Sequence, residues 1–183
     1  MLSPFEKTWK GIGFRHIPVK ADGMKLDPLN FKYCYGNHRW SAAKQWTFYL
    51  AEGVDILTVE WGRHQAESRS PKLAMNANKR EVFEIRVAKI LTIDLRDANV
   101  LKTLGGKGAP NCFLDKGKAR KEADFIRLHS DAQAIFVPVI GFLDHIDKWN
   151  LVIFLEKLGS DPTKFFKAKE PRFFTSTGNQ GLH

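Results

Sequence analysis

Two apolar runs of strand length constrain the fold of this chain more than any other feature. Residues 134–139 and 150–155 are almost continuously apolar, which is typical of strands buried on both faces. The longest apolar run, residues 134–143, has 10 residues and contains a proline and a glycine. A membrane-spanning helix needs roughly 20 apolar residues. We therefore expect a layered domain with two central strands and no membrane-spanning helix.

Further segments have the composition of strands. Residues 46–50 combine aromatic and β-branched side chains, and residues 82–87 and 90–95 alternate apolar with polar ones, which predicts three more strands. Residues 11–38 are rich in Gly, Pro, Asp and Asn with scattered aromatics. We expect short strands and turns there.

Two helices and two loops are also predicted. Leu50, Val54, Leu57 and Trp61 fall near one helical stripe, which predicts that a helix over residues 51–62 packs through these four side chains. The other predicted elements are a helix over residues 119–130, a polar basic loop over 68–80 and a glycine-rich loop over 105–110.

The composition is that of one folded domain with an anionic partner. Of 183 residues, 43% are hydrophobic and 27% are charged, so a single domain spanning residues 1–183 is expected. The net charge of +9 favours a nucleic acid, a nucleotide, an acidic protein or a membrane surface as partner. The first ten residues include three charges and no apolar segment, so we expect a cytoplasmic protein.

Cysteine and histidine usage does not indicate a metal site. Cys34 and Cys112 are the only cysteines, and neither belongs to a CxxC motif. The six histidines are dispersed, and of these only His38 lies beside residues of chemical interest. The P-loop, dinucleotide-binding and HExxH or GxSxG motifs are missing from the sequence.

The segment over residues 36–61 resembles the core of the RES domain, a family named for its Arg, Glu and Ser residues. The features that carry the resemblance are Arg39-Trp40, a strand ending at Tyr49, the tetrapeptide Tyr-Leu-Ala-Glu over 49–52, and Glu60. Arg39 precedes Tyr49 by 10 residues, and Tyr49 precedes Glu60 by 11. Arg15 resembles the family's early strand arginine, and residues 134–138 and 150–154 resemble its closing strands.

The resemblance implies an α+β fold like that of ADP-ribosyltransferases: one mixed domain with a central, mostly antiparallel sheet. It also implies a bacterial toxin that consumes NAD as substrate, with no cofactor, by breaking the nicotinamide–ribose bond. Water or inorganic phosphate would be the acceptor. The partner implied is a DNA-binding antitoxin of the Xre type or, for a delivered effector, an immunity protein. Neither a membrane nor a nucleic acid is expected as partner.

The chemistry of the residues agrees with that activity. The planar fork of Arg39, aided by Arg15, suits a diphosphate. Tyr49 can offer a ring face to nicotinamide and a hydroxyl to its ribose. A carboxylate at Glu60 would stabilise the oxocarbenium-like charge that develops on ribose. Asn150 resembles the polar residue that opens the family's last strand, although Asn at a strand start is also common turn chemistry.

Two features leave alternatives open. The family's serine follows the proline of the penultimate strand, whereas Val139-Ile140-Gly141 stands here, so a catalytically inactive RES-like domain is one alternative. After Gly159 the chain is basic and aromatic, and we expect a frayed tail over residues 160–183. This tail and the net charge make a nucleic-acid-binding or RNA-targeting protein the other alternative.

Overall fold

The computed structural model describes residues 2–19, 26–36, 38–66, 79–106, 108 and 110–175. Its strands are β1 (Lys7–Pro18), β2 (Thr47–Ala51), β3 (Lys79–Asp94), β4 (Ala134–Pro138), β5 (Trp149–Phe154), β6 (Phe166–Ala168) and β7 (Arg172–Thr175). Its helices are α1 (Val54–Ala66), α3 (Ala98–Thr103) and α4 (Lys116–His129). Two short 3₁₀ helices near the site are η3 (Asn111–Leu114) and η4 (Ile140–Phe142).

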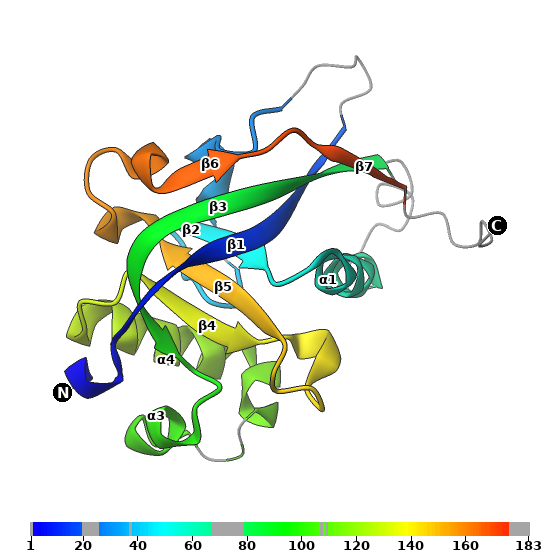
Figure 1. The fold of residues 1–183 in the computed structure, drawn as a ribbon. Coiled ribbons are helices and arrows are strands. Elements are labelled where there is room, and N and C mark those ends of the chain that lie inside the picture. Colours follow the sequence, from blue (N-terminus) through cyan, green and yellow to red (C-terminus); the bar gives the residue numbers. More distant parts are fainter. Residues whose placement is uncertain are drawn as a thin grey trace.

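Five strands close on themselves. The sheet runs in the order β1-β2-β5-β4-β3, and β1 also pairs with β3, so the path returns to its start. In Figure 1, β3 and β1 cross in front of β2, β5 and β4. Every pairing is antiparallel except that of β3 with β4. The expected fold class, one α+β domain around a mostly antiparallel sheet, is confirmed.

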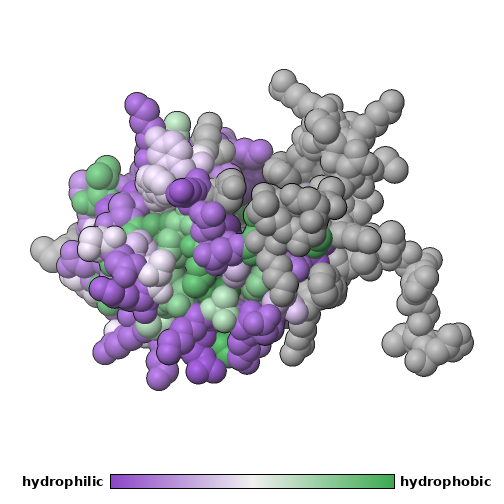
Figure 2. Space-filling view, turned by 90° about the horizontal axis from the view of Figure 1, so that it is seen from above, coloured by the Kyte–Doolittle hydropathy of each residue, from purple (hydrophilic) through white to green (hydrophobic). Residues whose placement is uncertain are grey.

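The sheet separates two apolar cores. Leu151 and Ile153 of β5 point into the core enclosed by the five strands, whereas Val152 and Phe154 point to the core under α4. Because β5 is buried on both faces, it needs apolar residues at nearly every position. Its fully buried neighbour β4 has the same requirement, and both predicted central strands are confirmed. Seen from above (Figure 2), hydrophilic side chains surround a band of apolar ones.

Several predicted elements differ from the observed ones. One long strand, β3, replaces the two strands predicted over 82–87 and 90–95, and the 12-residue β1 occupies part of the segment expected to form short strands. These two strands form one long ladder, and that pairing extends each beyond its local sequence pattern. Of the loop predicted over 68–80, residues 79–80 belong to β3 and the remainder lies outside the described residues.

The predicted packing face of the first helix is right for Leu57 and Trp61 and wrong for Leu50 and Val54. The helix begins at Val54, and Leu50 instead lies in β2 with its side chain in the core enclosed by the strands. Val54 is 38% exposed, whereas Ile56 is fully buried. The helix predicted over 119–130 is confirmed as α4, although Leu128 is 77% exposed.

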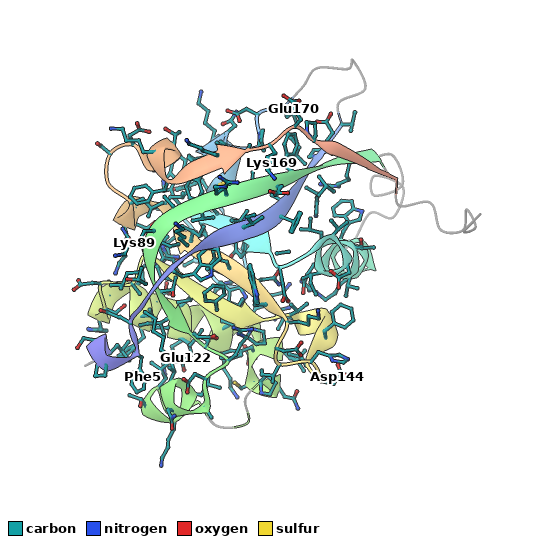
Figure 3. All side chains as sticks on the ribbon, in the orientation of Figure 1. Phe5, Lys89, Glu122, Asp144, Lys169 and Glu170 are labelled. Atoms are coloured by element: carbon teal, nitrogen blue, oxygen red, sulfur yellow. The ribbon has the colours of Figure 1, made fainter. Side chains whose placement is uncertain are left out.

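The C-terminal segment is not frayed as far as residue 175. Strands β6 and β7 both pair with β3, and Phe166 is buried in the core. Lys169, which Figure 3 shows beside Glu170 after β6, places its Nζ 2.5 Å from Glu84 Oε1. Residues 176–183 lie outside the described residues. In the part of the chain that is described, no helix is long and apolar enough to span a membrane.

Candidate active site

Strands β2 and β5, helix α1 and the segment before β2 meet at a cleft with two adjoining chambers. The chambers have volumes of about 250 Å³ and about 280 Å³, and together they fall within the range of about 300–1,000 Å³ that is usual for ligand sites. Four residues line both chambers: His38, Tyr49, Glu60 and Asn150. The boundary between the chambers is therefore where the predicted catalytic residues meet.

The register of β2 and β5 places Tyr49 and Asn150 together. Tyr49 pairs with Val152, and Ala51 pairs with Asn150. Because side chains alternate between sheet faces, Tyr49 and Asn150 lie on the same face at diagonal positions. The backbone of Asn150 also pairs with Val137 of β4. Asn150 is thus held between two strands at the cleft.

Burial makes ionisation of the Tyr49 phenol less favourable. Its Oη is buried and makes no well-formed hydrogen bond within the described part of the chain. Burial raises the pKa of Tyr49 to about 12, a rise that the nearby Ser41 side chain and Trp40 backbone partly oppose. The ring of His38 meets the Tyr49 ring edge-on with centroids 5.7 Å apart. A neutral hydroxyl at this position can donate a hydrogen bond to a ligand.

Glu60 lies in the middle of α1 with one carboxylate oxygen engaged. Its Oε2 accepts hydrogen bonds from Arg63 Nη2 at 2.7 Å and Nε at 3.2 Å. Its Oε1 is buried and has no hydrogen-bond partner among the described residues. The side chain is 21% exposed. Glu60 thus lines both chambers and keeps one buried carboxylate oxygen without a partner among the described residues.

The smaller chamber is strongly cationic. Its lining includes four basic side chains and only one carboxylate, that of Glu60. The basic residues are Arg39, Arg63, Lys116 and Arg120. Sequence reasoning identified Arg39 and missed the other three. Local spacing offered a signal, because Arg63 follows Glu60 by three residues and Arg120 follows Lys116 by four, which places each pair on one helix face.

Arg39 also links the segment before β2 to η3. Its Nη1 donates to the carbonyl oxygens of Phe113 and Leu114, both at 2.8 Å. These carbonyls end η3, immediately before Asp115 caps α4 by accepting from the backbone N–H groups of Gly117 and Lys118. Arg120 of α4 in turn donates from Nε to His38 O at 2.8 Å. The arginines therefore hold the start of α4 against the segment around residue 39.

Arg15 enters the larger chamber from β1. Its guanidinium carbon lies 4.5 Å from the centre of the Phe48 ring, and its Nη2 lies 3.7 Å from Cys34 Sγ. Burial raises the pKa of the Cys34 thiol, and Arg15 partly offsets the effect. All five predicted site residues thus border the cleft, four of them in the smaller chamber and Arg15 in the larger one.

Gly141, in the stretch 139–141 where a serine was expected from the resemblance, has no room for a side chain. Gly141 of η4 packs against Val59, the residue before Glu60 on α1. A Cβ at Gly141 would overlap Val59 Cγ1, and Val59 is a β-branched residue with little rotamer freedom in a helix. Close packing of α1 on η4 thus explains why glycine stands here.

No group of three or more potential metal-ligating side chains occurs among the residues that the structure describes. The donor set of the cleft, with four basic side chains and one carboxylate, suits an anion. A divalent cation would be repelled by this charge distribution.

Comparisons with known proteins agree with this geometry at the level of the fold. No family model matches the chain, and no curated protein matches it. Among solved structures, a chain of the MbcT–MbcA toxin–antitoxin complex of M. tuberculosis superimposes with a TM-score of 0.69 at 18% sequence identity. The match covers 93% of this chain and 87% of that chain. The chain therefore has the fold of a component of a toxin–antitoxin complex, which confirms the fold predicted from its resemblance to the RES domain.

Proposed function

We propose that this protein is a toxin that depletes NAD by breaking the bond between nicotinamide and ribose. The observation that carries the proposal is Glu60, whose buried Oε1 lacks a hydrogen-bond partner among the described residues. It lies where the two chambers meet, beside the neutral phenol of Tyr49. A carboxylate in an otherwise basic cleft suits NAD cleavage. The carboxylate can stabilise the positive charge that develops on the ribose, while the basic side chains bind the negatively charged diphosphate.

The bond cleavage needs no general acid. As the bond between ribose C1′ and the pyridinium nitrogen breaks, its electron pair goes to the nitrogen, and nicotinamide leaves as a neutral ring. Positive charge then develops on the ribose, where the Glu60 carboxylate stabilises it. Tyr49 Oη donates to a ribose oxygen. An oxygen of water or phosphate then gives a lone pair to C1′ and forms the new bond, and an attacking water passes its extra proton to the solvent.

The charge of the smaller chamber supports the placement of the NAD diphosphate there. Arg39, Lys116 and Arg120 line it alongside the Glu60–Arg63 ion pair. Guanidinium groups bind phosphate oxygens in pairs, and lysine adds a point charge. A diphosphate in this chamber leaves the nicotinamide ribose at the boundary, next to Glu60. We place Arg15 at the other side of the bound dinucleotide, in the larger chamber, and Asn150 at the boundary beside the ribose.

A neutralising antitoxin or immunity protein is the proposed partner. A solved structure that shares this fold is a toxin–antitoxin complex, and a catalyst that consumes NAD must be held inactive in the cell that makes it. The net charge of +9 favours an acidic partner surface.

The experiment is to incubate the purified chain with NAD and to measure free nicotinamide by chromatography, with and without phosphate. Glu60→Gln keeps the shape of the side chain and removes its charge, so turnover should fall about 10²- to 10³-fold. The matched control is Asp55→Asn, which makes the same chemical change on the same helix at an exposed residue that lines neither chamber. This variant should keep wild-type turnover.

The outcomes separate the alternatives. Nicotinamide release that depends on Glu60 but not on Asp55 supports the proposal. Folded wild-type protein that releases no nicotinamide over hours would favour the inactive domain or the nucleic-acid-binding protein. Binding of labelled RNA by that inactive protein would then identify the latter.

A further inference from the structure

A buried arginine beside the cleft has no role in the chemistry proposed above. Arg80 of β3 is 9% exposed, and it forms no ion pair with a carboxylate among the described residues. Its Nε is buried without a hydrogen-bond partner in that part of the chain, and burial lowers its pKa to about 10. A buried cation without a counter-ion destabilises a fold. Its presence therefore calls for a reason other than stability.

Arg80 is held by a histidine of the neighbouring strand. Arg80 Nη1 lies 2.9 Å from His16 Nδ1. A guanidinium can only donate, so His16 Nδ1 accepts and the ring is neutral in this arrangement. In the ladder of β1 with β3, His16 pairs with Val82, and Arg80 lies two residues before Val82. The two side chains therefore occupy diagonal positions on one face of the sheet.

Arg80 and His16 both pack against Trp61 of α1. The Arg80 guanidinium carbon lies 3.4 Å from the centre of the Trp61 ring, and the His16 ring meets that ring edge-on at 5.4 Å. Trp61 directly follows Glu60 in α1. Consecutive residues of an α-helix are about 100° apart around its axis. Fixing the Trp61 ring against the sheet therefore also fixes the direction in which Glu60 points.

The opposite side of α1 packs through apolar contacts. Val59 packs on Gly141 of η4, and Ile56 is buried beside Val139. These apolar contacts set how closely α1 approaches η4, and they are non-directional. A guanidinium stacked on an indole ring and hydrogen-bonded to an imidazole has a defined geometry. The Trp61 side is thus the one that can set the rotation of α1.

We propose that Arg80 is a positioning residue for Glu60, which it orients by stacking on Trp61 while His16 holds its guanidinium. The proposal rests on the function proposed for Glu60. Arg80 itself lines neither of the two chambers, whereas His16 lines the larger one. The consequence is a separation of roles, because Arg80 affects the rate of the reaction and not the binding of NAD.

Arg80→Met tests this separation. Methionine has a comparable length and no charge, and replacing a buried charge by an apolar side chain is often neutral or stabilising. We expect an unchanged or higher Tm, an unchanged KM for NAD and a kcat lower by about 10- to 100-fold, the cost of misplacing a reacting group by about 1 Å. Arg80→Lys restores a cation over the indole and should recover part of kcat. The control is Arg86→Met, an exposed residue of the same strand, which should behave as wild type.

A second readout keeps this inference separate from the proposed function. The chain is labelled with 5-fluorotryptophan, and the Trp61 resonance is assigned by its loss in Trp61→Phe. That resonance should shift in Arg80→Met and not in Arg86→Met, whether or not NAD is cleaved. Wild-type kcat in Arg80→Met, or a kcat that falls only in proportion to Tm, would overturn the inference. A shifted resonance in a chain that does not cleave NAD would instead refute the proposed function and leave the stack intact.

Discussion

Replacing Gly141 by serine should destabilise this protein. A Cβ at position 141 would lie 3.7 Å from Val59 Cβ and would overlap Val59 Cγ1 by more than about 1 Å, given the roughly 3.5–4.0 Å separation of carbon atoms in contact. Val59 cannot easily change rotamer within a helix, so α1 must move away from η4. Overpacking of this kind costs about 1–3 kcal/mol of unfolding free energy.

The same displacement reaches the catalytic site because Glu60 follows Val59. A shift of about 1 Å at a reacting group can lower the rate by as much as about 100-fold. Gly141→Ser should therefore lose both stability and turnover, although it adds the hydroxyl that the family uses. The measurements are urea-induced unfolding and a time course of NAD loss.

A double-mutant cycle identifies the cause. Val59→Ala removes the overlapping methyl group, so Gly141→Ser combined with Val59→Ala should recover about 1–3 kcal/mol relative to the sum of the single changes. Gly62→Ser is the matched control, because it adds the same side chain on α1 where a Cβ would meet no atom within 4 Å. Additive effects in the cycle, or wild-type stability in Gly141→Ser, would show that the packing argument is wrong.

Two further substitutions test the electrostatics of the cleft. Arg39→Lys should raise KM for NAD and lower the unfolding free energy by about 1.5–3 kcal/mol, because lysine cannot reproduce the hydrogen bonds that Arg39 donates to Phe113 O and Leu114 O; unchanged values of both would contradict the role given to Arg39. The raised pKa of Tyr49, about 12, means that the folded state keeps a proton that the unfolded state loses above about pH 10. The free energy of unfolding should therefore fall by about 2–3 kcal/mol as the pH rises from about 10 to 12, and this contribution is fully present below pH 10. Tyr49→Phe should lack this part of the pH dependence in urea unfolding compared between about pH 9 and pH 11, and an identical dependence in both proteins would argue against a buried phenol.

The parts of the fold that the sequence determined are those governed by local pattern. The apolar runs of β4 and β5 identify the central strands, because a strand buried on both faces needs apolar residues at nearly every position. The resemblance to the RES domain pointed to Arg39, Tyr49 and Glu60, and the fold does bring these residues to one cleft. For the two strands, the signal lies within the element that it predicts.

Contacts between distant segments decided the rest. The long ladder of β1 with β3 could not be predicted, since pairing energy and not local propensity extends both strands. Arg120 enters the cleft only because α4 packs its buried face on the sheet and turns its N-terminal half towards His38. From the sequence, the stretch that contains Gly141 lacks a serine. The structure shows that Val59, which contacts Gly141 from α1, leaves no room for a side chain there. A sequence states what each residue is, and only the tertiary structure decides which residues, far apart in the chain, share the same space.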